Sequence, residues 1–419
     1  MIVRSPRPED LEMPLDGFTG WITPVDRFFV RCHTYTPQVS MSEWSLKIDG
    51  KVDRPTTLTL DDLKKLPRVE LVSVLECAGN GRRFYEPHVA GTQWAFGSVG
   101  NGRWTGVRLR DVLQKAGIRS SAKEILFDGA DVPIGKMADF QRTITSAKAL
   151  HPDTLLAYEM NGQALPVQHG FPLRVIAPGW AGDSWVKWVQ HIEVLEHEFE
   201  GFWMKSAYRR PLHPVPPGGT VDASETVPVT DLNVKSVIAA PSGWAKPGTV
   251  RVQGTAWSNG SPVSKVEVST DGGRTWKSAK LGGSQTRYGW RLWQHDWKAA
   301  EGQYTLLSRA TNTAGQTQPL HQEWNPSGYL WNVAQPAAIT IAAQAPAAAV
   351  AGSSASETAL PDSYKRACFV CHDDHMMQQQ HLTRDQWDRE INKMTGWSGP
   401  IQPQDRDAIL NFLSSSFNQ

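Results

Sequence analysis

The sequence predicts an α+β protein of three domains in series, and three observations support this prediction. Residues 1–220 mix short strand and helix patterns without the regular strand–helix alternation of a doubly wound sheet. Residues 221–335 carry almost only strand patterns, and residues 362–419 carry helical ones. A chain of 419 residues is also long enough for two to four domains, at roughly 100–200 residues per domain.

The first domain, residues 1–220, is predicted to contain many short elements. Residues 60–66 begin a helix after Thr59, and Gly117 ends a helix over residues 110–116. Residues 69–75 form a β-rich run, and residues 172–177 and 185–195 are predicted to be buried strands. A cluster of prolines and glycines at 211–219 then marks the domain boundary.

The second domain, residues 221–335, is predicted to be an immunoglobulin-like β-sandwich. Residues 249–257 and 265–269 alternate in polarity, and Asp271-Gly272-Gly273 is a hairpin turn before residues 275–279. Residues 287–293 and 303–310 supply further strands. Several short strands at this spacing are typical of that fold.

Residues 336–361 are predicted to be a linker. They are rich in Ala, Pro, Ser and Thr, hold little Leu, Ile or Phe, and contain the breakers Pro346 and Gly352. Such a stretch cannot bury a core of its own, and it is too polar and interrupted to span a bilayer as a helix. The N-terminal residues also lack the apolar core of a secretory signal.

The C-terminal domain, residues 362–419, is predicted to contain two amphipathic helices. Thr383 is a candidate N-cap for a helix over residues 382–394, and a second helix covers residues 405–413. The hydrophobic core of so small a domain gives only marginal stability. The domain therefore needs a further source of stability, such as a covalent cross-link.

The composition argues against some classes of partner, and the small number of cysteines means that each one needs its own explanation. Lys and Arg total 43 against 42 Asp and Glu, so the net charge of +1 argues against nucleic acid or an anionic membrane as the main partner. The four cysteines are too few for a disulfide scaffold in so long a chain. They are Cys32, Cys77, Cys368 and Cys371.

Residues 368–372 read Cys-Phe-Val-Cys-His, the C-x-x-C-H pattern that attaches c-type haem. Cys368 and Cys371 lie on one helical turn, so both thiols can bond the haem vinyl groups while His372 lies beneath the iron. A redox pair or half of a zinc site is the alternative, but the sequence holds no second C-x-x-C to complete a zinc site. We therefore predict a cytochrome c domain that is stabilised by its covalent haem.

Met394 is our first candidate for the sixth iron ligand. A methionine opposite histidine raises the reduction potential, which suits an electron acceptor. A core methionine at helical spacing is the alternative interpretation. The competing ligands are Met376, Met377, His375 and His381.

Cys77 stands at the end of a β-run and before a Gly-rich turn with two arginines, Arg82 and Arg83. This is a good place for a soft thiolate ligand of a metal. A buried, inert cysteine is the alternative.

Seven separated stretches of the first two domains share their order and spacing with one enzyme family. They are 28–33 (Phe-Phe-Val-Arg-Cys-His), 76–83 (Glu-Cys-Ala-Gly-Asn-Gly-Arg-Arg), 127–131 (Phe-Asp-Gly-Ala-Asp), 157–162 (Ala-Tyr-Glu-Met-Asn-Gly), 169–174 (His-Gly-Phe-Pro-Leu-Arg), 185–188 (Trp-Val-Lys-Trp) and 324–325 (Trp-Asn). Through them, residues 20–335 resemble the sulfite oxidase family of molybdenum enzymes, bacterial sulfite dehydrogenases in particular.

The resemblance implies roles for individual residues. Cys77 matches the thiolate that ligates molybdenum beside molybdopterin. Arg31 and Arg82 match arginines of the sulfite pocket, where a guanidinium fork suits a tetrahedral oxyanion. Tyr208 matches the active-site tyrosine, and His33 a histidine of bacterial relatives. The residues implied to bind the cofactor are Arg31, Cys32, His33, Cys77, Asp131, His169, Arg174, Trp185, Val186 and Lys187.

The sequence departs from the family pattern at two positions. Cys32 lies where relatives often carry a polar residue, and we interpret it as a small filler rather than a spare thiol. The animal pattern places a further pocket arginine where this chain has Ser327. Serine cannot replace that charge, so weaker anion binding or a different substrate is expected.

The implied function is oxidation of sulfite to sulfate at a molybdenum–molybdopterin centre, with electrons passing through the haem on His372 to an external cytochrome c. Two alternatives stay open: a sulfane-sulfur molybdenum dehydrogenase, and a non-catalytic haem electron carrier. The family dimerises through its second domain, so a homodimer is an expectation that the sequence itself does not show. Covalent haem implies a periplasmic location, although this chain carries no signal sequence.

Overall fold

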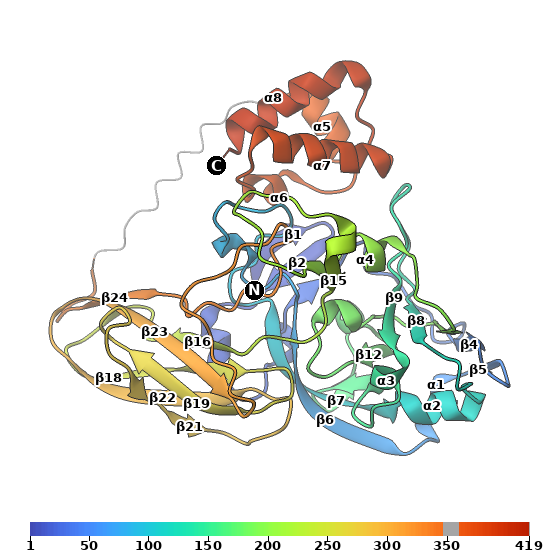
Figure 1. Ribbon diagram of the computed structural model, residues 1–419, viewed down its shortest axis with the longest axis horizontal. Coiled ribbons are helices and arrows are strands. Elements are labelled where there is room, and N and C mark those ends of the chain that lie inside the picture. The colour runs from blue at the N-terminus through green and yellow to red at the C-terminus, as the bar shows by residue number, and fades with distance from the viewer. Residues whose placement is uncertain (347–359, 419) are drawn as a thin grey trace.

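The computed structural model describes residues 1–346 and 360–418, which form three packed parts (Figure 1). The first domain is built on two five-stranded sheets. The first sheet has the order β11-β10-β7-β6, with β12 also paired to β10, and the second has the order β5-β4-β13-β8-β9. In the second sheet β13 pairs in parallel with β4, whereas its other pairs are antiparallel. This mixture confirms the α+β prediction.

The bounds of these strands follow the chain. They are β4 (Leu46–Gly50), β5 (Thr56–Leu58), β6 (Arg68–Glu76), β7 (Val99–Arg108), β8 (Glu124–Asp128), β9 (Arg142–Thr145), β10 (Leu155–Met160), β11 (Gln163–Ala164), β12 (Arg174–Ile176) and β13 (His191–Leu195). Two smaller sheets join β1 (Ile2–Pro6), β2 (Glu9–Glu12) and β3 (Val30–Arg31), and β14 (Arg209–Pro211) with β15 (Thr226–Pro228).

The helices of this domain are short and end at the expected signals. Thr59 forms a capping box with Asp62 at the start of α1 (Leu60–Lys64). Gly117, at φ 76°, ends α2 (Leu109–Ala116) in the left-handed conformation that glycine adopts without strain. The remaining two are α3 (Ser146–Ala149) and α4 (Phe202–Lys205).

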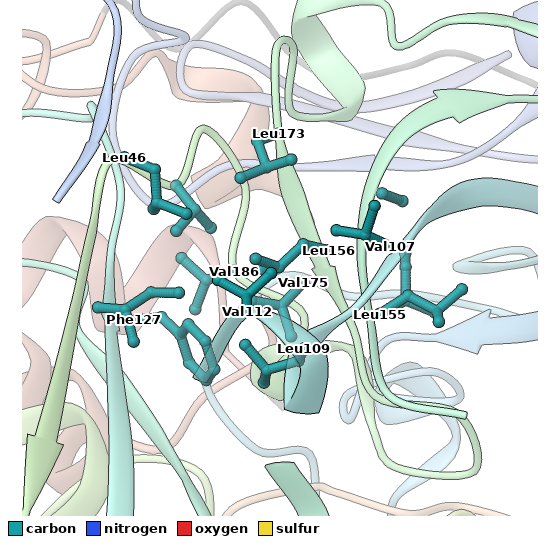
Figure 2. Close-up of a cluster of buried hydrophobic side chains, with 14 of the residues drawn as sticks. Leu46, Val107, Leu109, Val112, Phe127, Leu155, Leu156, Leu173, Val175 and Val186 are labelled. Atoms are coloured by element: carbon teal, nitrogen blue, oxygen red, sulfur yellow. The ribbon is translucent and has the colours of Figure 1, made fainter. Parts of the chain in front are cut away.

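The main core lies where α2 packs on the two sheets (Figure 2). Leu109 and Val112 of α2 are fully buried, together with Val107, Phe127 and Leu156 from the strands. Burying each such side chain stabilises the fold by about 1.5–3 kcal/mol. This core holds the strand ends from which the site residues project.

The prediction of one strand over residues 185–195 was wrong in its first half. Strand β13 begins only at His191. Trp188 adopts φ 54°, which interrupts an extended strand, and Val186 O instead accepts a hydrogen bond of 2.9 Å from Val175 N. Residues 185–188 are therefore an irregular segment.

The second domain is a sandwich of two sheets, with the strand orders β16-β18-β22-β21 and β17-β24-β23-β19-β20. Their strands pair in antiparallel fashion, apart from the parallel pair β17 and β24. Their strands are β16 (Lys235–Ala240), β17 (Gly243–Ala245), β18 (Gly248–Trp257), β19 (Val263–Ser269), β20 (Lys277–Ser278), β21 (Lys280–Gly282), β22 (Arg291–Ala299), β23 (Gly302–Asn312) and β24 (Ala337–Ile341). This architecture is consistent with the predicted immunoglobulin-like sandwich.

Strand β24 lies inside the stretch predicted to be linker, so that boundary needs correction. It pairs with β17 in parallel and with β23 in antiparallel fashion. Ile339 and Ile341 are buried and alternate with exposed or half-buried neighbours, and this short signal is hidden among alanines. The sandwich therefore extends to 341, and residues 347–359 of the predicted linker lie outside the described residues.

The C-terminal domain consists of α5 (Asp362–Cys368), α6 (Asp374–Gln378), α7 (Arg384–Gly396) and α8 (Arg406–Ser416). Thr383 caps α7 in a capping box with Gln386. Its small core includes Tyr364, Trp387 and Ile409. Figure 1 shows this domain packed over the first domain, with α6 near β1 and β2. Within the described residues, no helix is long and apolar enough to cross a membrane.

Candidate active site

Segments that are far apart in the sequence bring the candidate residues to one place. Arg31 is the last residue of β3, Cys77 follows β6 directly, and Arg82 begins a single 3-10 turn, Arg82–Phe84. Tyr208 lies just after α4 at φ 53°. A non-glycine residue in this conformation costs of order 1–3 kcal/mol, which the surrounding contacts must offset.

Arg31 is held by a buried carboxylate that sequence reasoning missed. Its Nη1 lies 3.2 Å from Oδ1 of Asp10, which is 2 % exposed. Asp10 also accepts hydrogen bonds from Thr92 Oγ1 at 2.8 Å and from Cys32 N at 3.2 Å. Burial has the largest single effect and lowers the pKa of Arg31, but Asp10, Tyr208, Cys77 and Cys32 together raise it by a larger amount, so that the pKa lies above its ordinary value. Arg31 is therefore a fixed cation.

Arg82 is a second buried cation, and it lies in a cradle of glycines. A Cβ on Gly79 would lie 2.9 Å from Nη1 of Arg82, and a Cβ on Gly91 would lie 2.8 Å from the same atom. Its Nη1 and Nη2 donate to the carbonyls of Thr92 and Ser327, at 3.2 and 3.3 Å. Its Nε has no hydrogen-bond partner among the residues that the structure describes. The guanidinium is positioned but not neutralised, which suits anion binding.

Tyr208 and His33 form a neutral hydrogen-bonded pair. Tyr208 Oη lies 2.6 Å from His33 Nε2. Burial, aided by the charge of Arg31, lowers the pKa of His33 well below its ordinary value. Burial also raises the pKa of Tyr208 well above its ordinary value. Neither group carries a charge near neutrality, so the pair can hold or move a single proton.

Aromatic rings clamp this pair in place. Phe140 stacks on the His33 ring with centroids 4.1 Å apart, and Tyr329 stacks on Tyr208 at 5.3 Å. The guanidinium carbon of Arg82 also lies 5.1 Å from the Tyr329 ring centroid. Tyr329 thus stands beside the position where the animal pattern has an arginine. The nearby Trp-Asn stretch was the signal that could have pointed to Tyr329, whereas nothing local pointed to Phe140 or Asp10.

The Cys77 side chain is half-buried beside these groups. Its backbone N–H donates to Ser98 O at 2.9 Å, which continues the strand geometry past β6. Burial raises the pKa of Cys77 to about 11. The free side chain is therefore a thiol, and a metal ion would have to displace its proton on binding.

A second group of predicted residues surrounds Arg174. Its Nη1 and Nη2 donate to the carbonyls of His169 and Trp185, at 3.0 and 3.1 Å. Its buried Nε has no hydrogen-bond partner within residues 1–346 and 360–418. Burial lowers the pKa of Arg174 to about 9 and that of His169 to about 3. A buried cation with an unpartnered donor points to an anionic ligand.

The side chain of Lys187 contacts the thiol of Cys32. Its Nζ donates to Cys32 Sγ at 3.2 Å and to Gln168 O at 3.0 Å. Asp131, buried nearby, accepts a hydrogen bond of 3.1 Å from Thr34. Cys32 therefore contacts a cationic side chain of the site, that of Lys187. Its role as a cofactor contact stays a prediction.

One cavity collects nearly all of these side chains. Its lining includes Arg31, Cys32, His33, Cys77, Asp131, His169, Arg174, Trp185, Val186, Lys187 and Tyr208. A soft thiol ligand, several cations and an unpartnered arginine N–H are the groups that a molybdenum–molybdopterin cofactor requires. The residues therefore fit that cofactor.

A second cavity of about 450 Å³ adjoins the first and extends into the C-terminal domain. Arg31, His33, Cys77 and Tyr208 line both cavities, whereas Arg82 lines only the second. From the C-terminal domain its lining includes Cys368, Cys371, His372, Met376, Met377, Met394, Leu382, Trp387, Ile391, Ile401 and Leu413. The volume lies within the range of about 300–1,000 Å³ that is usual for ligand pockets.

The two histidine competitors for the sixth iron position do not line this cavity. His375 Nε2 lies 2.8 Å from Val3 O, and His381 Nδ1 lies 3.3 Å from Asn418 O. Met394 faces the cavity together with Met376 and Met377, so the three methionines remain candidates.

The fold and this site define a molybdopterin-dependent oxidoreductase. Residues 33–203 match the oxidoreductase molybdopterin binding domain family, and residues 226–341 match the Mo-co oxidoreductase dimerisation domain family. The chain belongs to the sulfite oxidase family. It is 31 % identical over 361 residues to sulfite oxidase of Arabidopsis thaliana, a match that covers 78 % of this chain and 91 % of that protein.

Two further proteins extend the comparison. Mitochondrial sulfite oxidase of Macaca fascicularis is 37 % identical over 350 residues, or 79 % of this chain, and the match spans 64 % of that relative's length. The crystal structure of sulfane dehydrogenase SoxCD from Paracoccus pantotrophus matches with a TM-score of 0.70 and 29 % identity, covering 79 % of this chain and 84 % of that one. The family is thereby established.

Proposed function

We propose that this protein oxidises sulfite to sulfate at a molybdenum–molybdopterin centre and passes the electrons to a covalent haem in its C-terminal domain. The reaction balances as SO₃²⁻ + H₂O → SO₄²⁻ + 2H⁺ + 2e⁻. One observation carries the proposal: Cys77 and the Cys368, Cys371 and His372 motif line the same cavity. Donor and acceptor sites therefore face each other without any rearrangement of the domains.

Different residues have different proposed roles at the molybdenum site. When bound through Cys77, the cofactor supplies oxygen-atom transfer and accepts two electrons. Arg31 and Arg82 bind and orient the sulfite anion, and Asp10 keeps Arg31 in place. The Tyr208–His33 pair holds a proton at Tyr208 Oη or His33 Nε2 and can exchange it with substrate or product.

The haem would be held by Cys368, Cys371 and His372, with Met394 as the proposed second axial ligand. Apolar side chains such as Leu382, Trp387 and Ile391 line that part of the cavity and suit a porphyrin. Burial raises the pKa of Cys368 to about 12, so its side chain is a thiol before attachment. The residues fit a c-type haem.

Three wider proposals follow from this function. Haem c would pass its electrons singly to an external cytochrome c. Covalent haem attachment would require a compartment outside the cytoplasm, so we propose a periplasmic location. The match of the second domain to a dimerisation domain family supports a homodimer.

The decisive experiment is an optical titration of the oxidised holoenzyme with sulfite, with molybdenum and iron content measured alongside. We expect sulfite to reduce the haem of the same molecule, and Cys77→Ser to slow this reduction at least about 1,000-fold, since the metal loses its only protein thiolate. Ser264→Ala, at an exposed position of the sandwich where the hydroxyl donates to Thr311 O, is the control and should leave the rate within about three-fold. A haem that sulfite does not reduce, in protein containing molybdenum, would contradict the proposal; iron without molybdenum would favour a simple electron carrier.

Substitution of the methionines identifies the axial ligand. Met394→Leu should lower the haem reduction potential, because methionine ligation raises it. Met376→Leu and Met377→Leu, which remove the other methionines of the cavity, should leave the potential nearly unchanged. A fall in potential on changing Met376 or Met377 instead would reassign the ligand.

A sulfane-sulfur dehydrogenase is the second candidate. The similarity to a sulfane dehydrogenase structure favours it, as does Ser327, whose side chain lacks the pocket charge expected of a sulfite site. Initial rates with sulfite and with a sulfane-sulfur substrate separate the two.

A further inference from the structure

Strand β2 carries two buried carboxylates on one face. Asp10 and Glu12 are 2 % and 1 % exposed, and the two-residue period of a strand directs both side chains to the same side. Glu12 accepts hydrogen bonds from Gly97 N at 2.8 Å and from Ala95 N at 3.0 Å, and Arg4 Nε lies 2.5 Å from its carboxylate. Glu12 therefore fixes this segment to the strand and has its own counter-charge.

Asp10 is linked to both arginines of the anion pocket, to one directly and to the other through Thr92. Its Oδ1 lies 3.2 Å from Arg31 Nη1. Its Oδ2 accepts a hydrogen bond of 2.8 Å from Thr92 Oγ1, and Thr92 is itself buried. The carbonyl of Thr92 accepts a hydrogen bond of 3.2 Å from Arg82 Nη1. Arg31, Asp10, Thr92 and Arg82 therefore form one continuous chain of contacts.

The backbone before Thr92 is held by its own hydrogen bonds. Gln93 Nε2 donates to Val89 O and to Gly91 O, both at 2.8 Å. Gly91 lets the Arg82 side chain lie against this backbone, because a Cβ there would lie 2.8 Å from Arg82 Nη1. A rotation of this segment about its attachment to β2 would therefore move the Thr92 carbonyl and the guanidinium that donates to it.

We infer that Thr92 is a positioning residue that sets Arg31 and Arg82 relative to each other. The inference rests on the proposed function and deepens it, because two guanidinium groups bind one oxyanion well only when their donors are correctly spaced. Thr92 acts on Arg31 through Asp10 and on Arg82 through its own carbonyl. Its hydroxyl is neutral, so removing it changes the geometry of the pocket without changing the charge.

The test compares the wild-type holoenzyme with Thr92→Val, which removes the hydroxyl and keeps the branched side chain. Thr92→Ser keeps the hydroxyl and is the rescue variant. Thr105→Val is the matched control, since Thr105 is fully buried and its Oγ1 has no hydrogen-bond partner in the described part of the chain. The measurements are kcat and KM for sulfite with ferricyanide as acceptor, the Kd of sulfate by calorimetry, and thermal unfolding.

Thr92→Val should raise both the KM for sulfite and the Kd of sulfate at least about ten-fold, while kcat stays within about three-fold. Thr92→Ser and Thr105→Val should keep all three constants within about three-fold of wild type. The contacts of Glu12 remain in every variant, so we expect Thr92→Val to stay folded. Unchanged sulfate binding in folded Thr92→Val, or an equal loss in Thr105→Val, would overturn the inference.

Combining Thr92→Val with Arg31→Lys and with Arg82→Lys tests whether Thr92 acts on both arginines. In each background the effect of Thr92→Val on the Kd of sulfate should fall to about three-fold, because one of the two guanidinium groups that it positions is absent. A ten-fold effect that persists in either background would mean that Thr92 acts only on the other arginine, and would overturn the inference. Absence of sulfite oxidation in wild type would overturn the proposed function, whereas sulfate binding, which needs no turnover, would still decide the role of Thr92.

Discussion

The first domain meets its two neighbours through junctions of opposite chemical character. Toward the sandwich, the carboxylate of Glu76 accepts hydrogen bonds from Lys235 Nζ at 2.6 Å, Trp257 Nε1 at 2.7 Å and Asn80 Nδ2 at 2.8 Å. The Glu76 and Lys235 side chains are 5 % and 7 % exposed. This junction is a buried ion pair with its hydrogen bonds satisfied.

Toward the C-terminal domain the junction is built differently. Side-chain amides donate to main-chain carbonyls, as Gln379 does to Arg4 and Gln380 to Gly91. Across residues 1–346 and 360–418, no ion pair joins the C-terminal domain to the rest of the chain. Arg7 Nη2 adds one charge-assisted hydrogen bond to Phe369 O at 2.6 Å. Hydrogen bonds between amides and carbonyls are largely replaced by bonds to water when the two groups separate.

The difference shows which domain is part of the site and which is docked onto it. Glu76 directly precedes Cys77, so the sandwich helps to fix the position of the proposed metal ligand. Removing either partner of this ion pair would leave the other charge buried and unpaired, which costs several kcal/mol. At the junction with the C-terminal domain, removing a side-chain amide leaves no unpaired charge, so the expected cost is lower.

Glu76→Gln should break the first junction and have the largest effect. It leaves Lys235 buried without a counter-charge, and we expect a loss of about 3–5 kcal/mol in the free energy of unfolding. Denaturant unfolding of the first two domains measures this. Glu70→Gln, which removes an exposed partner of Arg103, should cost at most about 1 kcal/mol. Equal effects of the two variants would refute the contrast.

Acid should weaken the first domain. Burial holds the pKa of His169 at about 3, below its unfolded value of about 6.5. The unfolded chain therefore binds the extra proton between these values, so stability falls as the pH falls below 6.5. Between pH 7 and pH 5 this residue should account for about 2 kcal/mol. Unfolding of His169→Gln at both pH values is the comparison, and an undiminished pH dependence would argue against His169.

Gln380→Ala tests the junction with the C-terminal domain, where we expect a smaller change in free energy. It removes two buried hydrogen bonds, to Gly91 and Gln93, and should weaken docking by about 1–2 kcal/mol. Faster hydrogen exchange over residues 88–93 is the readout. Gln378→Ala removes an exposed amide bonded to Asp374 within its own domain, and it should leave exchange unchanged.

Salt should have the smallest effect of all on docking. Raising NaCl from about 0.05 M to about 1 M shortens the Debye length to about 3 Å, but a junction without ion pairs offers little for salt to screen. Small-angle scattering should show the C-terminal domain docked at both concentrations. Undocking at high salt would mean that charge holds this junction as well.

Local sequence signals were sufficient for several elements and for the haem motif. Thr59 and Thr383 cap their helices and Gly117 ends another, because capping depends on residues within one turn. The C-x-x-C-H pattern places its chemistry within five consecutive residues. Cys77 was recognised by the strand before it, although its proposed role came from resemblance to a family and stays a prediction.

The tertiary structure decided what depends on distant segments. Strand β24 exists because β17 and β23 pair with it, and the irregular path at Trp188 follows from packing that no local pattern shows. Asp10 reaches Arg31 across 21 residues, and Tyr329 reaches Tyr208 across a domain boundary. The sequence by itself determined the elements and the reactive residue types, because these arise from short-range periodicity. Only the fold determined that the C-x-x-C-H motif lines the same cavity as Arg31 and Arg82, because that arrangement depends on contacts between chain segments hundreds of residues apart.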